Sequence, residues 1–248
     1  MAFRIGKYAP YGSQTNYGIE ISTPLAIPNC GLWFDFNDIS TLFQDAARTT
    51  PVTTNGQNIV GVTDKSGSGN HGSSASSTKP TYNTGGFLGK CFATGAGYLT
   101  TSYVPATGNG SRTICALITG NDTGTAGIYF GYGTNSSGQL YAARKLGAPA
   151  KLNIDYNGSV LVGNAILTNN MIIMRYNGVT DQLYRNGYLQ ASQNTTLNTG
   201  SGNGFFLGGN LLGLAIVFEC NEVAVYNRWL QDHELNLVTT YMMRKWNM

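Results

Sequence analysis

The sequence predicts an all-β protein, an antiparallel two-sheet sandwich that is closed by one C-terminal helix. The first observation is that 33 of the 248 residues are glycine; together with many Thr, Ser, Asn and Tyr residues, this favours short strands joined by turns. The second is the recurrence of Asn-Gly, a hairpin signal, at 157–158, 177–178 and 186–187. The third is a single stretch of helical periodicity at the end of the chain. The length suffices for one large all-β domain or two small ones.

Residues 1–29 lack a clear periodicity, and prolines and glycines recur through them. Aromatic side chains are interleaved nevertheless, which is unlike a solvated linker. We expect either an extended arm that packs these aromatics on another surface, or an ordinary strand along the domain's own sheet. As an anchor the arm would use Phe3, Tyr8, Tyr11 and Tyr17.

Residue 30 begins a series of short runs that are rich in β-branched and aromatic residues, as is typical of strands. Turn residues separate the runs at the spacing expected for a sandwich. The last run is expected to form a pair of strands. The predicted strands lie at 31–36, 57–64, 90–94, 97–102, 112–119, 126–133, 139–144, 151–156, 171–177, 181–187, 204–210 and 215–228.

One substantial helix is predicted over about residues 231–246, within LQDHELNLVTTYMMRKW. Apolar side chains recur there at helical spacing. Arg244 and Lys245 fall in the last turn, where they suit the helix dipole. The helix should close over one end of the sandwich, with an apolar stripe that consists of Leu235, Val238, Met242 and Trp246.

The segment DKSGSGNHG (64–72) matches the G-x-G-x-x-G pattern of dinucleotide-binding turns. Such a site requires a helix that opens directly at the glycines, so that its N-terminus faces the pyrophosphate. A serine-rich, proline-bearing segment follows instead, and no βαβ alternation is present, so we exclude a dinucleotide site. We expect a tight turn, held by side-chain hydrogen bonds and by glycines with positive φ. Its residues are Asp64, Ser66, Gly67, Gly69 and Asn70, with Asp64 as a weaker candidate calcium ligand.

The four cysteines form no C-x-x-C pair and have no nearby histidine, so we expect no zinc site, and we predict no cofactor. They lie in apolar runs typical of strands, where lone cysteines are usually small buried core residues. Disulfides between them stay an alternative. The four are Cys30, Cys91, Cys115 and Cys220.

Charged residues make up only 11% of the chain, and the formal net charge is +3. This balance does not give the broad basic surface that nucleic-acid binding requires, so we expect no nucleic acid as a partner. The N-terminus lacks the apolar stretch of a secretory signal. The longest apolar run, residues 211–218, is far too short to cross a bilayer. We therefore expect a protein that is made in the cytoplasm and does not enter a membrane.

No catalytic group can be assembled from the sequence. A glycosidase on a β-sandwich needs two carboxylates that face one cleft. The candidate pairs, Asp35 with Asp38 and Glu219 with Glu222, are each separated by three positions, so on a strand their side chains should point to opposite faces. The two histidines lie in no nucleophile motif and are expected to be exposed; they are His71 and His233. We expect no enzymatic activity.

Glycan binding is harder to exclude, because aromatic faces and amide groups hold sugars and the chain has 15 tyrosines and 3 tryptophans. Trp33 lies in a strand typical of a core and Trp246 lies on the apolar stripe of the helix, so both should pack internally. Trp229, beside Arg228 at the junction of strand and helix, is the candidate glycan contact.

Three segments of the chain follow one recognisable pattern. They are GLWFDFNDISTLFQDAARTTPVTTNGQNIVGVTDKSGSGNHG, which follows it from Leu32 to His71, KPTYNTGGFLGKCFATGAGYLTTS, and, after LGGN (207–210), NEVAVYNRWLQDHELNLVTTYMMRKW. They resemble concanavalin A-like (LamG-like) jelly-roll domains of tailed-bacteriophage virion proteins. The resemblance covers roughly residues 30–248 and is weak in the middle. An aspartate common in the family is absent at 94–97, and Gln231 replaces the usual serine before the helix, so the N-cap should be lost or shifted to Asp232.

The resemblance implies a jelly-roll sandwich over residues 30–248, preceded by the arm at 1–29. It also implies a non-enzymatic virion structural protein, either a capsid decoration protein or a module of the tail or fibre, that is attached through the arm. The expected partners are other virion proteins or a second copy of the chain. The alternative is a lectin-like adhesion module that recognises carbohydrate on the host surface, because this fold carries lectins, enzymes and structural modules alike.

Overall fold

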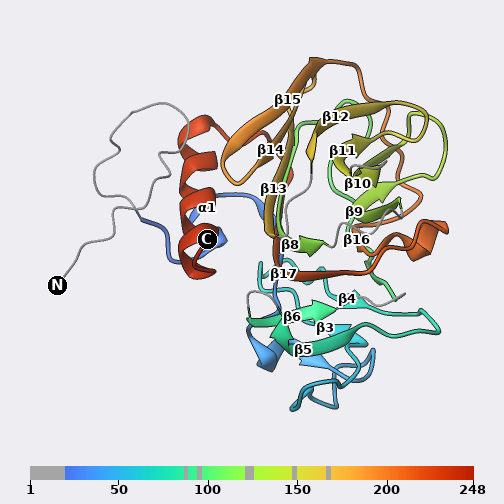
Figure 1. Ribbon diagram of the computed structural model, residues 1–248, viewed down its shortest axis with the longest axis vertical. Coiled ribbons are helices and arrows are strands. Elements are labelled where there is room, and N and C mark those ends of the chain that lie inside the picture. The colour runs from blue at the N-terminus through green and yellow to red at the C-terminus, as the bar shows by residue number, and fades with distance from the viewer. Residues whose placement is uncertain (1–19, 87–88, 94–96, 121–125, 147–149, 166–168) are drawn as a thin grey trace.

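Two antiparallel sheets packed face to face, with one C-terminal helix, form the described part of the protein in the computed structural model (Figure 1). This arrangement confirms the predicted fold class, an all-β sandwich. The described residues are 20–86, 89–93, 97–120, 126–146, 150–165 and 169–248.

The first sheet, called here the helix-side sheet, contains eight strands. Seven follow in the order β15-β14-β13-β8-β17-β6-β5, and β1 pairs with β17 on the same side as β6. Their bounds are β1 (Cys30–Asp35), β5 (Thr81–Gly86), β6 (Gly89–Ala93), β8 (Arg112–Gly120), β13 (Asn169–Tyr176), β14 (Thr180–Arg185), β15 (Tyr188–Asn194) and β17 (Phe218–Tyr226).

The second sheet contains nine strands, in the order β12-β11-β10-β9-β16-β7-β4-β3-β2. Strands β2, β4, β5, β12 and β15 lie outside the predicted runs. β2 and β4 have only two residues each, and β5 and β15 are rich in glycine or polar residues. The bounds in the second sheet are β2 (Leu42–Phe43), β3 (Gly61–Val62), β4 (Gly72–Ser73), β7 (Leu99–Thr101), β9 (Gly127–Gly133), β10 (Leu140–Leu146), β11 (Lys151–Asp155), β12 (Val160–Ala165) and β16 (Phe206–Leu207). Short 3-10 helices are η1 (Pro24–Ala26), η2 (Ile39–Thr41) and η3 (Gly209–Leu212).

Strand β17 is one continuous strand, so the prediction of a strand pair within residues 215–228 is wrong. The residues between the two expected strands form a β-bulge between Cys220 and Glu222. The carbonyl of the extra residue, Asn221, accepts a hydrogen bond from the backbone N–H of Phe36 at 3.0 Å. Before the bulge β17 pairs with β6, and after it with β1. The bulge therefore marks the point where the neighbouring strand changes.

Two of the Asn-Gly pairs form the expected tight turns. Asn186 and Gly187, with φ of 50° and 81°, connect β14 to β15, and Asn157 and Gly158, with φ of 57° and 121°, lie between β11 and β12. Positive φ at both central positions is typical of the type I′ turn that joins adjacent strands. At the third pair only the glycine, Gly178, has a positive φ, 99°.

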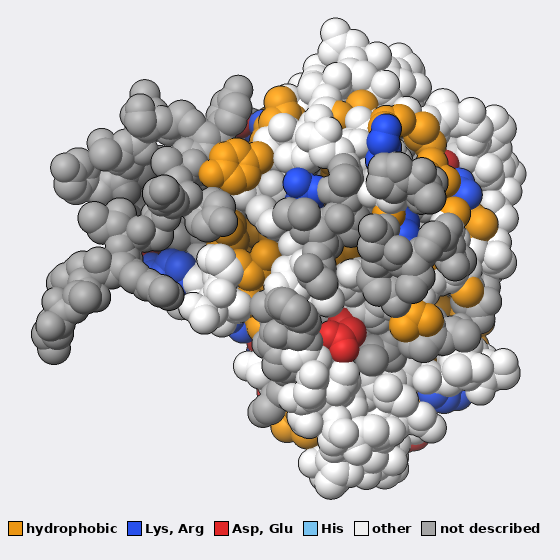
Figure 2. All heavy atoms as spheres, in the orientation of Figure 1, with side chains coloured by type: hydrophobic (Ala, Val, Ile, Leu, Met, Phe, Trp, Pro, Cys, Tyr) orange, Lys and Arg blue, Asp and Glu red, His pale blue; other side chains and the backbone are white. Residues whose placement is uncertain are grey.

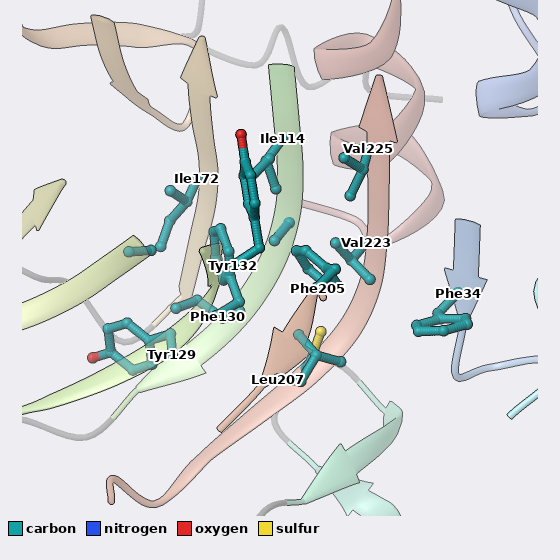
Figure 3. Packing of buried hydrophobic residues seen from close by; sticks show 14 of the residues in the cluster. Phe34, Ile114, Tyr129, Phe130, Tyr132, Ile172, Phe205, Leu207, Val223 and Val225 are labelled. Atoms are coloured by element: carbon teal, nitrogen blue, oxygen red, sulfur yellow. The ribbon is translucent and has the colours of Figure 1, made fainter. Parts of the chain in front are cut away.

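The core lies between the two sheets and consists largely of aromatic and branched aliphatic side chains (Figure 3). Ile114 and Ile172 come from the helix-side sheet, and Phe130 comes from β9 of the second sheet. The ring centroids of Phe130 and Phe205 are 6.3 Å apart. Each such side chain contributes about 1.5–3 kcal/mol when it is fully buried, so this layer holds the two sheets in a fixed relation.

Helix α1 (Asp232–Lys245) covers the outer face of the helix-side sheet (Figure 1). Its predicted apolar stripe packs there in a second apolar cluster, together with residues of β1, β8, β13 and β17. Trp33 and Trp246 belong to this cluster and are only 4% and 6% exposed, which confirms that both pack internally.

Gln231 is the N-cap residue of the helix, so the expected shift of the cap to Asp232 is wrong. The backbone N–H of Gln231 donates to Oε2 of Glu234 at 2.9 Å. A carboxylate at the third helical position satisfies the amide of the N-cap residue in this way, and the first turn is closed without a serine.

Residues 20–29, called here the strap, are the described part of the predicted arm, and they pack on the chain's own sandwich. Ile27 is buried in the cluster under α1. The hydroxyl of Tyr226 donates to the carbonyl oxygen of Pro24 at 3.0 Å. The predicted aromatic anchors lie outside the described residues: Phe3, Tyr8, Tyr11 and Tyr17.

None of the three cysteines whose side chains are described forms a disulfide. Cys115 and Cys220 are fully buried, as expected, whereas Cys30 is half-buried. Burial raises the pKa of the Cys30 thiol to about 12, so this thiol stays protonated and poorly nucleophilic at neutral pH. The side chain of Cys91 lies outside the described residues.

Candidate functional site

A cavity of about 740 Å³ lies between α1, the strap and the end of β1; we call it the helix-side pocket. The strap and β1, which are consecutive in the sequence, meet the distant α1 there, because α1 lies across the outer face of the sheet and the strap runs beside it. The lining residues are Glu20, Ile21, Ser22 and Thr23 of the strap, Trp33 and Asp35 of β1, Lys65 of the glycine turn, and His233, Asn236, Leu237, Thr240, Tyr241, Arg244 and Lys245 of α1.

A buried carboxylate, Glu222 of β17, connects α1 to the sheet beside this pocket. It is fully buried, and it accepts hydrogen bonds from Nε1 of Trp33 and of Trp246, both at 2.8 Å. The hydroxyl of Tyr241 donates to it at 2.9 Å and Nζ of Lys245 at 2.8 Å. A carboxylate is tolerated away from water only where donors replace its hydration. Burial, and then the charge of Glu222, raise the pKa of Tyr241 far above its usual range, so this phenol stays a donor.

Asp35 lies directly opposite Glu222 in the register of β1 with β17. Nζ of Lys245 lies 2.8 Å from a carboxylate oxygen of each residue and bridges them. Nζ of Lys65 lies 3.4 Å from Asp35 and 2.6 Å from Asp38. Partial burial alone would raise the pKa of Asp38, but the hydrogen bond from Lys65 holds it below its usual value. The two lysines thus connect the acidic residues of this cluster into one network.

This network corrects the prediction that the two carboxylate pairs point to opposite faces. Strand β1 ends at Asp35, and the chain turns before Asp38, so both side chains reach Lys65. In β17 the bulge shifts the alternation by one position, so Glu219 and Glu222 both point away from the core. The carboxylates that do meet at the pocket belong to different strands.

The predicted glycine turn has the hydrogen bonds expected of it. Oδ1 of Asp64 accepts from the backbone N–H groups of β1 and of Ser66, at 2.9 and 2.8 Å. Its Oδ2 accepts from the Ser66 hydroxyl at 2.7 Å and from the backbone N–H of Asn70 at 3.0 Å. Gly67 and Gly69 have φ of 83° and 75°. Asp64 therefore serves the turn as a hydrogen-bond acceptor, and among the described residues no group of three or more acidic, histidine or cysteine side chains is placed to hold a metal.

The histidine in this turn is also part of its structure. Nδ1 of His71 accepts a hydrogen bond from the backbone N–H of Asp64 at 3.1 Å, and His71 is half-buried. The expectation that both histidines are exposed is thus wrong for His71, whereas His233 is exposed at the rim of the pocket.

The candidate glycan contact, Trp229 with Arg228, lies outside the helix-side pocket and takes part in internal contacts. The guanidinium of Arg228 donates to both carboxylate oxygens of Glu234, at 2.7 and 2.6 Å. This pairing lowers the pKa of Glu234 below its usual value. The guanidinium of Arg175 lies over the ring of Trp229, 3.9 Å from its centroid. These contacts hold the start of α1 against the sheet.

No protein-family model matches the sequence, and no curated protein matches it. Solved structures match its fold. Domain 4 of AbnA, a GH43 extracellular arabinanase from Geobacillus stearothermophilus solved in complex with arabinotriose, is similar with a TM-score of 0.58 at 15% identity, over 86% of this chain and 98% of that one. A GH54 α-L-arabinofuranosidase is similar with a TM-score of 0.58 at 14% identity, over 75% of this chain and 50% of that one.

The ligand binding domain of botulinum neurotoxin serotype D, solved in complex with N-acetylneuraminic acid, is similar with a TM-score of 0.54 at 11% identity, over 74% of this chain and 50% of that one. The chain spans about half the length of this toxin domain and of the GH54 enzyme. At these identities the likeness shows the β-sandwich fold alone. The resemblance to tailed-phage domains stays a prediction from the sequence.

On the described part of the face in Figure 2, the Lys, Arg, Asp and Glu side chains are scattered among hydrophobic side chains, uncharged polar side chains and backbone. Within the described residues, no helix combines the length and the apolar character needed to cross a membrane.

Proposed function

We propose that the chain is a non-catalytic carbohydrate-binding module and that the helix-side pocket is its binding site. The observation that carries this proposal is the pocket itself. Its volume lies within the range of about 300–1,000 Å³ that is typical of small-molecule sites. Its wall combines apolar side chains, Ile21 and Leu237, with the amide of Asn236 and the hydroxyl of Thr240. Sugars present both C–H faces and hydroxyl groups, so this combination suits them.

The charged network beside the pocket suits a structural role better than a catalytic one. Glycoside hydrolysis needs one carboxyl group that delivers a proton and a second that acts as nucleophile or base. Glu222 is fully buried and accepts four hydrogen bonds, and Lys245 bridges it to Asp35. Both carboxylates are therefore held by donors of the protein itself. The network fastens α1 to the sheet and so fixes one wall of the pocket.

The likeness to AbnA domain 4 supports a binding role for a domain of this size, because this chain covers nearly the whole of that one. That domain was solved with arabinotriose, and the serotype D toxin domain with N-acetylneuraminic acid. The two ligands differ in charge, so these neighbours leave the class of sugar open.

A glycan array followed by isothermal titration tests the proposal. The wild-type chain should bind at least one oligosaccharide, and the double variant Asn236→Ala/Thr240→Ala should weaken binding about tenfold, since each lost hydrogen bond costs about 0.5–1.5 kcal/mol. The matched control is Thr54→Ala/Asn58→Ala, two exposed positions that do not line the pocket, which should bind like the wild type. An equal loss of oligosaccharide affinity in both double variants would contradict the proposal, and so would the absence of any glycan ligand.

A second candidate function, attachment to a phage particle, rests on the sequence resemblance over Leu32 to His71 and at the C-terminal end. In this reading the module is a virion structural protein held by the first residues of the chain. The strap packs on the sandwich, so the variant to make lacks residues 2–19 and keeps residues 20–29. It should melt within a few degrees of the full chain and be absent from purified particles by mass spectrometry. Its incorporation at the wild-type level would exclude this mode of attachment.

A further inference from the structure

The charges that line the helix-side pocket already have partners within the protein. Lys245 bridges Asp35 and Glu222, and Lys65 pairs with Asp35 and Asp38. These pairs are partly or fully buried, so the removal of one partner would leave a charge without compensation, at a considerable cost.

A further ion pair, between Glu20 of the strap and Arg244 of α1, lies at the rim. The hydrogen bond that Arg244 donates to the carboxylate of Glu20 lowers the pKa of Glu20 and raises the pKa of Arg244. The side chains are 67% and 60% exposed, so this pair is weak and can open. Arg244 is therefore the cation at the pocket that an anionic ligand could recruit most readily.

Four uncharged polar side chains also line the pocket. The side chains of Asn236 and Thr240, four residues apart on α1, face the pocket together. Those of Ser22 and Thr23 lie on the strap, on the opposite wall. Among the described residues, none of these four side chains has a hydrogen-bond partner. They provide hydroxyl and amide groups that can both donate and accept, which is what a sugar hydroxyl requires.

We infer that the pocket selects an uncharged oligosaccharide and discriminates against acidic ones, such as sialylated or uronic-acid glycans, and that the Glu20–Arg244 pair sets this selectivity. The inference rests on the proposed function. The hydroxyl groups of a neutral sugar can form hydrogen bonds with the four polar side chains that lack a partner, and every ion pair stays intact. An acidic sugar would meet the carboxylates of Glu20 and Asp35 unless Arg244 first left its partner. The selectivity thus comes both from repulsion between these carboxylates and an acidic sugar and from hydrogen bonds between the four polar side chains and a neutral one.

The test is an array on which each neutral glycan stands beside its sialylated or uronic-acid form, probed with the wild type, Glu20→Ala and Arg244→Ala. The control is Lys151→Ala, an exposed cation outside the pocket. The wild type should bind neutral members at least fivefold more strongly than their acidic forms. This binding should change little when sodium chloride is raised from about 0.02 to about 0.5 M, because no ion pair forms with the ligand. Glu20→Ala, which frees Arg244, should gain at least threefold in binding to the acidic forms.

The outcomes separate the two claims. Wild-type binding confined to acidic glycans and lost in Arg244→Ala would overturn the selectivity but keep the carbohydrate function. An unchanged neutral-to-acidic ratio in Glu20→Ala would likewise overturn the role of the ion pair. The absence of any glycan ligand would overturn the proposed function and this inference with it.

Discussion

At the scale of single residues, the most unusual group is Asp181 of β14, which is fully buried between the sheets. Its oxygens accept hydrogen bonds from the hydroxyls of Tyr141 and Tyr156, at 2.9 and 2.5 Å. The guanidinium of Arg112, also fully buried, lies 5.0 Å from the ring centroid of Tyr141. Burial raises the pKa of Asp181 to about 6, although these hydrogen bonds and the charge of Arg112 oppose it.

This pKa predicts a pH-dependent stability. An aspartate in the unfolded chain titrates near about 3.9, so the folded state binds the proton more tightly. The stabilisation from the protonated Asp181 is therefore fully present below about pH 4 and is lost as the pH rises through about 6. The difference between these two pKa values corresponds to about 3 kcal/mol of unfolding free energy. Asp181→Asn does not ionise, so its unfolding free energy should rise relative to wild type by up to that amount between about pH 4 and about pH 7.

Urea unfolding of both proteins at the two pH values measures this difference. Tyr156→Phe, which removes one donor to the carboxylate, should raise the pKa of Asp181 further and move the pH-dependent loss to higher pH. If the difference in unfolding free energy between wild type and Asp181→Asn is the same at both pH values, the carboxyl group has one charge state throughout, which would contradict the prediction.

At the scale of elements, the glycine turn makes a prediction about backbone conformation alone. Gly67 and Gly69 have φ of 83° and 75°, and a Cβ atom added at either position would have no atom within 4 Å. Gly67→Ala and Gly69→Ala should therefore each destabilise the protein by about 1 kcal/mol, through strain in the left-handed region and not through a clash. Gly85→Ala is the control, because Gly85 lacks a positive φ and its Cβ atom would meet its nearest neighbour at 3.6 Å; it should change the unfolding free energy little. Equal effects at all three positions would refute this account.

The elements that the sequence predicts well are those fixed by local chemistry. The positive φ of Gly67 and Gly69 follows from the turn residues around them, and the helix from its apolar period. The network of Asp35, Lys245 and Glu222 has no comparable signal. It depends on the pairing of β1 with β17, whose contacting residues Trp33 and Glu222 are 189 positions apart. It also depends on the bulge in β17, which sets the face on which Glu222 lies.

At the scale of the whole molecule, alternating short strands and Asn-Gly turns were enough to predict a sandwich, because each sheet must bury one face against the other. The strand order cannot be predicted in the same way. β17 lies between β8 on one side and β6 and β1 on the other, and this order is set by contacts between residues that are distant in the chain. The helix-side pocket combines the strap, α1, β1 and the glycine turn, so it could not be located until that order was known.

The central claim, that this pocket binds carbohydrate, is tested most directly by mapping backbone amide chemical shifts by NMR during titration with an oligosaccharide identified on the array. The account predicts that the largest changes fall on the strap and on α1, at Ser22, Thr23, Asn236 and Thr240, with little change in the second sheet. Saturable shifts centred on the second sheet, with the amides of the strap and of α1 unmoved, would contradict it.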